Sequence, residues 1–125
     1  MGIRNLQVVS VPVGDQDRAK AFYVDTLGFT LRRDNPMGPD QRWVEVAPPH
    51  GDTSLTLVTW FPTMPAGSLK GIVLATDNIE ADYAELSRRG VAFHGPIQKE
   101  FWGTFATFDD PDGNGWVLAQ DRAGA

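Results

Sequence analysis

The chain has 125 residues, 42% of them hydrophobic, which suits one soluble domain with a real core and is too short for two independent domains. Its formal net charge of −5 argues against a nucleic-acid surface, which needs a basic face, and no apolar run is long enough to span a membrane. The absence of cysteine excludes disulfides, thiolate chemistry and sulfur-based zinc sites and, with the lack of a secretion signal, predicts a cytoplasmic location.

The first half of the chain opens with a strand and a helix. Residues 3–13 are rich in β-branched side chains and predict a strand. Asp15 is the predicted N-cap of a helix over residues 15–27, because its side-chain oxygen can accept from the free N–H groups of the first turn. Gly28 ends this helix. The apolar side chains on it recur with helical spacing, at Ala19, Phe22, Tyr23 and Leu27.

Short strands and turns follow the first helix. The segment 34–40, DNPMGPD, is dense in turn formers and predicts a loop, with Met37 folding inward over a cavity. A proline- and glycine-rich crossover occupies residues 61–68. The predicted strands of this half are 29–33, 42–46 and 54–60. The order of elements is therefore βαβββ.

The second half repeats this order. A helix with an apolar stripe is predicted between an N-cap at Asp77 and a stop at Gly90, positions that correspond to Asp15 and Gly28 in the first half. Residues 95–103 predict a loop, DPDGN at 110–114 predicts a turn, and the tail 121–125 is expected to fray. The predicted strands are 70–76, 91–94, 104–108 and 116–120. We interpret residues 1–125 as a single domain with module one at about 1–60 and module two at about 69–121.

Two motifs bracket nearly the whole chain, namely D-x-D-x-A-x-x-F-Y-x-x-x-L-G-F after an apolar strand and the DPDGN turn before the last strand. Together they resemble the vicinal oxygen chelate superfamily, which includes glyoxalase I, bleomycin-resistance proteins and extradiol dioxygenases. The resemblance implies an α+β fold of two paired βαβββ modules, whose mixed, curved sheets form a cleft with flanking helices. It also implies a homodimer, and a pocket lined by inward-pointing strand residues.

Catalytic members of this superfamily hold a divalent metal with His, Glu or Gln side chains from four strands. Carried over by position, the resemblance places these ligands at Val8, Thr56, Gly71 and Val117. Valine and glycine side chains have no donor atom, and a lone threonine hydroxyl is a poor ligand. A shift of one residue offers only Gln7 at the first position. We therefore expect no metal site there and no cofactor.

Other chemical groups are few. His50 lies in a Pro-Gly turn and predicts an exposed residue, whereas His94 ends a short strand and is the one weak catalytic candidate, for proton transfer near pH 7. Glu45 could face a cavity, but its alternation with Val44 and Val46 favours the solvent face.

An aromatic and neutral polar lining remains for the pocket. Trp60 and Trp102 offer stacking surfaces, with packing or dimer contacts as the alternative, and Ser10 and Thr56 could each give one hydrogen bond from the floor. Three further aromatic strand residues are expected in the core: Trp43, Phe105 and Trp116. The predicted ligand-binding residues are Val8, Ser10, Thr56, Trp60, Gly71, Trp102 and Val117.

Three functions compete. The leading hypothesis is a metal-free protein that binds a planar or hydrophobic small molecule, with no nucleic-acid or membrane partner. The second is a glyoxalase-type lyase or isomerase, or a dioxygenase, with a displaced metal site. The third is a metal-independent enzyme with His94, Glu45 or Asp110 as its acid–base group. Whether the protein is an enzyme stays open at this point.

Overall fold

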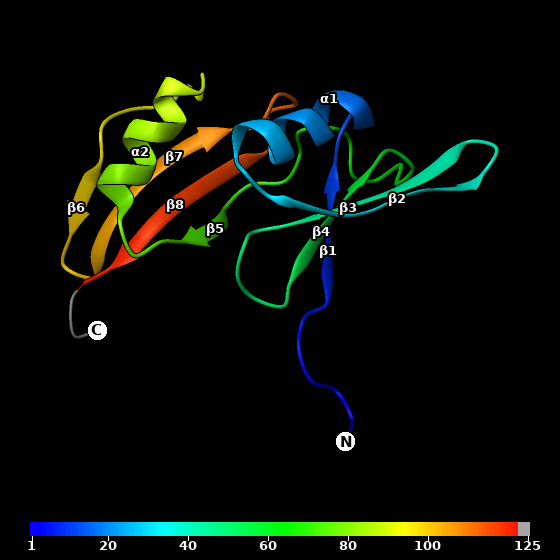
Figure 1. Ribbon diagram of the computed structural model, residues 1–125, viewed down its shortest axis with the longest axis horizontal. Coiled ribbons are helices and arrows are strands. Elements are labelled where there is room, and N and C mark those ends of the chain that lie inside the picture. Colours follow the sequence, from blue (N-terminus) through cyan, green and yellow to red (C-terminus); the bar gives the residue numbers. More distant parts are fainter. Residues whose placement is uncertain (123–125) are drawn as a thin grey trace.

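The computed structural model describes residues 1–122 and consists of two four-stranded sheets and two helices (Figure 1). The first sheet has the order β1–β4–β3–β2 and the second the order β5–β8–β7–β6. The strands of the first sheet are β1 (Val8–Pro12), β2 (Thr30–Gly38), β3 (Gln41–Ala47) and β4 (Ser54–Val58). Those of the second are β5 (Ile72–Ala75), β6 (Gln98–Glu100), β7 (Gly103–Asp109) and β8 (Gly115–Asp121).

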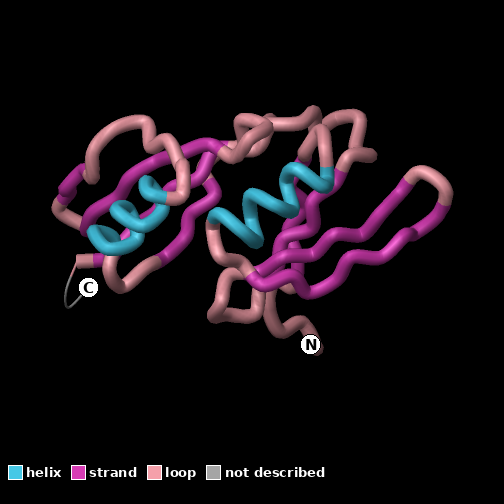
Figure 2. Tube along the Cα trace, turned by 45° about the horizontal axis from the view of Figure 1, so that its top comes forward, coloured by secondary structure: helices cyan, strands magenta, loops and turns pink. Residues whose placement is uncertain are grey.

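Each module has the same internal plan. A parallel pair, β1 with β4 and β5 with β8, joins antiparallel neighbours, and each helix packs on the sheet of its own module. The two modules lie beside each other, as Figure 2 also shows. The predicted α+β fold of two paired βαβββ modules is therefore confirmed. None of the helices within residues 1–122 is long and apolar enough to cross a membrane.

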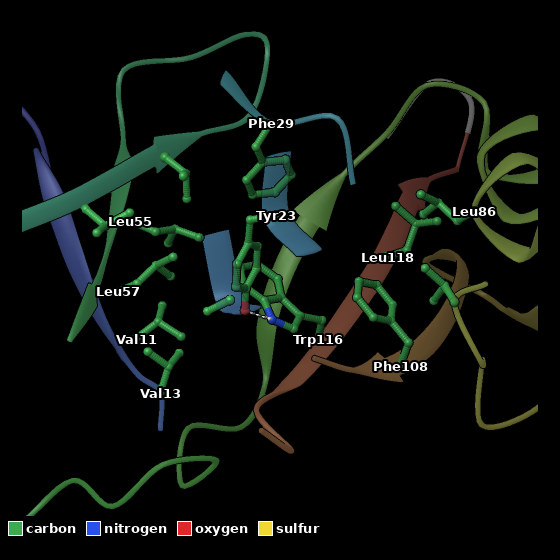
Figure 3. Close-up of a cluster of buried hydrophobic side chains, with 14 of the residues drawn as sticks. Val11, Val13, Tyr23, Phe29, Leu55, Leu57, Leu86, Phe108, Trp116 and Leu118 are labelled. Carbon is green, nitrogen blue, oxygen red and sulfur yellow. Dashed lines mark hydrogen bonds between the residues drawn. The ribbon is translucent and has the colours of Figure 1, made fainter. Parts of the chain in front are cut away.

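One buried cluster joins the two modules (Figure 3). Val11 and Leu57 enter it from the first sheet and Phe108 and Trp116 from the second, with Tyr23 between them. The Tyr23 hydroxyl donates to Asp110 Oδ2 over 2.6 Å and accepts from Trp116 Nε1 over 3.0 Å. Burial raises the pKa of Tyr23, and the nearby Asp110 charge raises it further, so the phenol stays protonated and remains a donor.

The first helix is shorter than predicted and changes its winding. α1 (Gln16–Ala21) has the predicted cap, because the Asp15 side chain accepts from Arg18 N over 3.0 Å. A π-helical turn, η1 (Phe22–Thr26), then continues to Gly28, whose φ of +78° ends it as predicted. In this turn the Leu27 N–H donates to Phe22 O over 2.9 Å. Within the predicted stripe, Ala19 and Tyr23 are fully buried.

The second helix starts one residue later than predicted. α2 (Ile79–Arg88) is capped by Asn78, whose side chain accepts from Ala81 N over 3.2 Å, so the prediction of Asp77 as cap is wrong. Asn and Asp are about equally good caps, and the sequence offered both side by side. The predicted stop is right, since Gly90 has a φ of +98°.

The predicted loop at 34–40 is also wrong, because β2 runs through most of it and pairs with β3 as a long hairpin (Figure 1). Pro36 is tolerated because β2 is an edge strand, where the missing N–H is not needed, and the register shifts next to it. Asp34 fixes the hairpin by accepting from Arg42 Nε and from Lys20 Nζ, each over 2.7 Å. Met37 does not fold inward, since 44% of its surface is exposed.

The remaining differences concern strand ends. The first strand begins only at Val8, and residues 91–94 contribute a single bridge, Phe93 with Phe108, instead of a strand. β6 lies inside the segment 95–103 that was predicted as a loop. Of the tail 121–125, Asp121 still belongs to β8, and residues 123–125 lie outside the described residues.

The predicted turn at 110–114 is present and connects the modules. Asp110 N donates to Asn114 O over 2.9 Å, and Asn114 Nδ2 donates to Pro12 O over 2.8 Å. Asp112 Oδ1 accepts from Gly14 N over 3.0 Å. The turn therefore holds the end of β1 and the start of the first helix against the start of β8.

Candidate functional site

The first sheet has a core face and a second face that is unusually polar. Val44, Val46 and Leu57 point into the core, so alternation turns their strand neighbours to the opposite side. In register, Ser10 pairs with Thr56 and Thr56 with Glu45, which forms one row across β1, β4 and β3. We call this surface the polar face and define it by Ser10, Trp43, Glu45, Ser54 and Thr56.

Glu45 lies at the β3 end of this row and is only 7% exposed, so the prediction that it faces solvent is wrong. Glu45 does point away from Val44 and Val46, but this face of the strand is not open to solvent at its position. Trp43 Nε1 donates to Glu45 Oε1 over 3.0 Å. Trp43 is therefore half-buried on the polar face, and the prediction that it belongs to the core is wrong. The signal in the sequence was this spacing, because residues two apart on a strand share a face.

The carboxylate of Glu45 is kept ionised by its neighbours. Burial raises its pKa, but hydrogen bonds from Trp43 and Ser54 and the charges of Arg33 and Arg32 outweigh it, so the pKa of Glu45 lies below its ordinary value. Arg32 is itself engaged, because its Nη1 donates to Ser54 Oγ over 2.9 Å. The polar face therefore presents a fixed negative group at neutral pH.

Thr56 is the other unusual member of the polar face. It is 1% exposed, and within residues 1–122 its Oγ1 has no hydrogen-bond partner. Ser54, beside it on the same strand and face, is also 1% exposed but is hydrogen-bonded. Buried polar atoms without partners are uncommon in native proteins, so the contacts within residues 1–122 do not account for a hydroxyl at this position.

The second sheet carries an apolar face on the side opposite its core. Phe108, Trp116 and Leu118 are buried, and the alternate residues point away from them. Val117 pairs with Val73, which is 60% exposed. Trp102 stacks on Phe105 with 5.5 Å between ring centroids and is 41% exposed. We define the apolar face by Val73, Trp102, Phe105 and Val117; Phe105 is half-buried on it rather than in the core as predicted.

His94 lies beside the apolar face. Its Nδ1 is 2.9 Å from Thr107 Oγ1, and its Nε2 is 3.3 Å from Asp109 Oδ1. Thr107 pairs with Val117, which links this group of three polar residues to the apolar face. His50 is exposed, as predicted.

A groove of about 700 Å³ lies elsewhere, between the modules on the helix side. Leu74 and Leu118 contribute from the second sheet, Phe29 and His50 from the first module, and Arg89 from α2. Three of its charged residues are already engaged, since Arg89 donates to Glu85 Oε2 over 3.0 Å and Asp82 Oδ2 accepts from Thr76 Oγ1 over 2.5 Å. None of the seven predicted ligand-binding residues lines this groove.

The positions of the family's metal ligands do not fit a metal. Val8 pairs with Ser54 on β4, and Val117 has Val73 and Thr107 as neighbours, so neither position brings a nitrogen or carboxylate donor. Gly71 precedes β5 and has no side chain. Within the described part of the chain, no three His, Asp or Glu side chains are grouped so that they could hold a metal ion. We derive no chemistry through a metal for this site.

Five of the seven predicted ligand-binding residues fall into two groups, and Trp60 and Gly71 lie outside them. Val8, Ser10 and Thr56 lie on β1 and β4 of the first sheet, and Trp102 and Val117 belong to the apolar face of the second. Trp60 lies two residues beyond the end of β4, half-buried, with its ring centroid 6.2 Å from that of Phe61. Their role in ligand binding stays a prediction.

Comparisons with known proteins agree on one family. The model of the Glyoxalase/Bleomycin resistance protein/Dioxygenase superfamily matches residues 5–118. TnmS3, an antibiotic binding protein from Streptomyces sp. CB03234, is 54% identical, and its crystal structure superposes with a TM-score of 0.91 over 98% of this chain and 99% of that one. A superfamily member from Sphaerobacter thermophilus DSM 20745 is 35% identical, with a TM-score of 0.87 over 97% and 100% of the two chains. The uncharacterized protein YetH of Bacillus subtilis (strain 168) is 35% identical, covering 94% of this chain and 99% of its own.

Proposed function

The chain belongs to the Glyoxalase/Bleomycin resistance protein/Dioxygenase superfamily, as its motifs predicted, and we propose that it is a metal-free protein that binds aromatic or hydrophobic small molecules. One observation carries the proposal. At the four positions where catalytic relatives hold a metal, the chain has Val8, Thr56, Gly71 and Val117, and the surrounding faces offer aromatic and polar groups instead of metal ligands.

The two faces suit different parts of one ligand. Trp102 and Val117 on the apolar face provide stacking and apolar contact for a planar ring system. Glu45 and Thr56 on the polar face provide hydrogen-bonding groups that fix its orientation. The 54% identity to TnmS3 over nearly the whole of both chains supports a binding role of the same kind.

A second copy of the chain would bring the two faces together. Val73 is 60% exposed on β5, at one edge of the second sheet, and Phe101 and Trp102 are 83% and 41% exposed in the turn between β6 and β7, towards its other edge. Such a group of exposed apolar side chains is typical of an interaction surface. We propose a homodimer in which the apolar face of one copy covers the polar face of the other. Light scattering of the purified protein tests this, and a monomer at micromolar concentration would contradict it. The cytoplasmic location stays a prediction.

Binding and metal content are tested on the same preparation. We expect that polycyclic aromatic ligands quench tryptophan fluorescence and raise the melting temperature, because a ligand that binds only the native state stabilises it. We also expect no stoichiometric metal after incubation with nickel, zinc, manganese or iron(II). W102A is the test variant, and M37A is its control, because Met37 is an exposed apolar residue of the β2–β3 hairpin outside both faces. A panel without any response, or one metal ion per chain, would refute the proposal.

A metal-independent enzyme is the second candidate, supported by the contacts of His94. An imidazole between a hydroxyl and a carboxylate, as between Thr107 and Asp109, is a common arrangement for proton transfer. If any turnover of a bound ligand is detected, H94A is expected to abolish it without changing the affinity. Unchanged turnover in H94A would remove this candidate.

A further inference from the structure

The row Ser10–Thr56–Glu45 contains more polar atoms than the chain itself satisfies. Glu45 accepts from Trp43 Nε1, and the Thr56 hydroxyl beside it has no partner within residues 1–122. Both side chains are more than nine-tenths buried. Replacing such groups by apolar residues of similar shape is often neutral or stabilising, so stability of the fold alone does not explain them.

The positive charges near this row are placed so that they do not neutralise it by direct contact. Arg32 Nη1 donates to Ser54 Oγ, and its Nη2 lies 3.5 Å from Gly51 O, so the hydrogen bonds of its guanidinium go to these groups while only its charge acts on Glu45. Arg33 pairs with Glu45 in register but is exposed. What the row presents at short range is therefore a carboxylate and a hydroxyl, both of which accept a hydrogen bond.

Resting on the proposed function, we propose that Glu45 and Thr56 form the polar anchor of the ligand site and select aromatic ligands that carry a hydrogen-bond donor, an ammonium or a hydroxyl group, next to the ring. Glu45 accepts from the donor, and the side chains that cover Thr56 move aside so that its hydroxyl gains the partner that it lacks in the free chain. A ligand with the same ring and no donor gains neither hydrogen bond, so its affinity is lower than that of a ligand that carries the donor.

Three probes with one ring system separate ring stacking from donor recognition: the aminomethyl, hydroxymethyl and methyl derivatives of anthracene, substituted on the central ring. Titration of the wild-type protein, followed by fluorescence, is expected to give affinities in that order, with the aminomethyl probe about tenfold tighter than the methyl probe. E45Q keeps the shape and the Trp43 contact but removes the charge. E45Q is expected to lower the affinity for the aminomethyl probe about tenfold and to leave the affinity for the methyl probe unchanged.

T56V provides a second variant that does not depend on how E45Q folds, because valine matches threonine in shape. T56V is expected to bind the methyl probe with the affinity of the wild type and to bind the hydroxymethyl probe about fivefold more weakly. Equal affinity of all three probes for the wild type would overturn the anchor and leave the proposed function standing. The same ratio of affinities in wild type, E45Q and T56V would also overturn it. If no probe binds the wild type, the proposed function and the anchor both fail.

Discussion

The hydrogen bonds of Tyr23 offer a sharp test of how the two modules are held together. Tyr23 is fully buried, donates to Asp110 over 2.6 Å and accepts from Trp116 over 3.0 Å. Y23F removes both bonds, keeps the ring and creates no cavity. A hydrogen bond to a charged group contributes about 1.5–3 kcal/mol, and leaving the buried Trp116 N–H unpaired costs about 1–3 kcal/mol. Because such contributions overlap, we expect a loss of about 3 kcal/mol in the free energy of unfolding.

The matched control is Y83F. Tyr83 donates to Gly95 O over 3.0 Å at a half-buried position, so its loss is expected to cost about 1 kcal/mol. Urea unfolding followed by circular dichroism at one protein concentration measures both variants, with unchanged m-values as evidence that the unfolding transition is comparable. For Y23F the corresponding fall in melting temperature is roughly 10 °C. If Y23F is no less stable than Y83F, the network does not hold the modules together as argued.

Three further predictions concern the first hairpin, a glycine and the second helix. Hydrogen bonds from Arg42 and Lys20 lower the pKa of Asp34. D34N is therefore expected to lower the free energy of unfolding by about 1 kcal/mol above pH 4, and urea titrations should show this difference fading as the pH falls further. G67A places a methyl group onto a carbonyl oxygen of the 110–114 turn and should lower the free energy of unfolding by at least ~3 kcal/mol. G71A has a similar positive φ but open space around it and should lower the free energy of unfolding by only ~1 kcal/mol, so equal losses would contradict the clash. N78A should lower the free energy of unfolding by ~1 kcal/mol and D77A should leave it almost unchanged. A lower melting temperature for D77A than for N78A would contradict the assigned cap.

The sequence predicts most of the fold because the signals that mark its boundaries are local. The Asp15 cap, the glycines at 28 and 90 and the turn at 110–114 depend on neighbours within a few residues, and all four are present. The hairpin containing Pro36 was missed for the opposite reason. Proline predicts a loop from its own chemistry, and only the position of β2 at the sheet edge, which depends on distant strands, makes it acceptable.

The candidate site was harder to predict than the fold. Alternation correctly turned Glu45 away from Val44 and Val46, but the burial of that face depends on cross-strand pairing of Thr56 with both Ser10 and Glu45. Pairing between strands far apart in sequence is not visible in local patterns. The sequence therefore indicated the polar residues one by one and could not show that they form a row.

The placement of these groups explains how such a fold can change its chemistry. The Tyr23–Asp110–Trp116 network and the turn at 110–114 lie on the core side and join the modules there. The family's metal positions lie on the opposite faces, so a ligand residue can be exchanged for valine or glycine without removing any of these contacts. The motifs that identify the superfamily belong to the core side and therefore report the fold, while in our proposal the residues of the polar face select the ligand. On this reasoning T56V should change probe affinities and leave the unfolding transition intact, and Y23F should do the reverse.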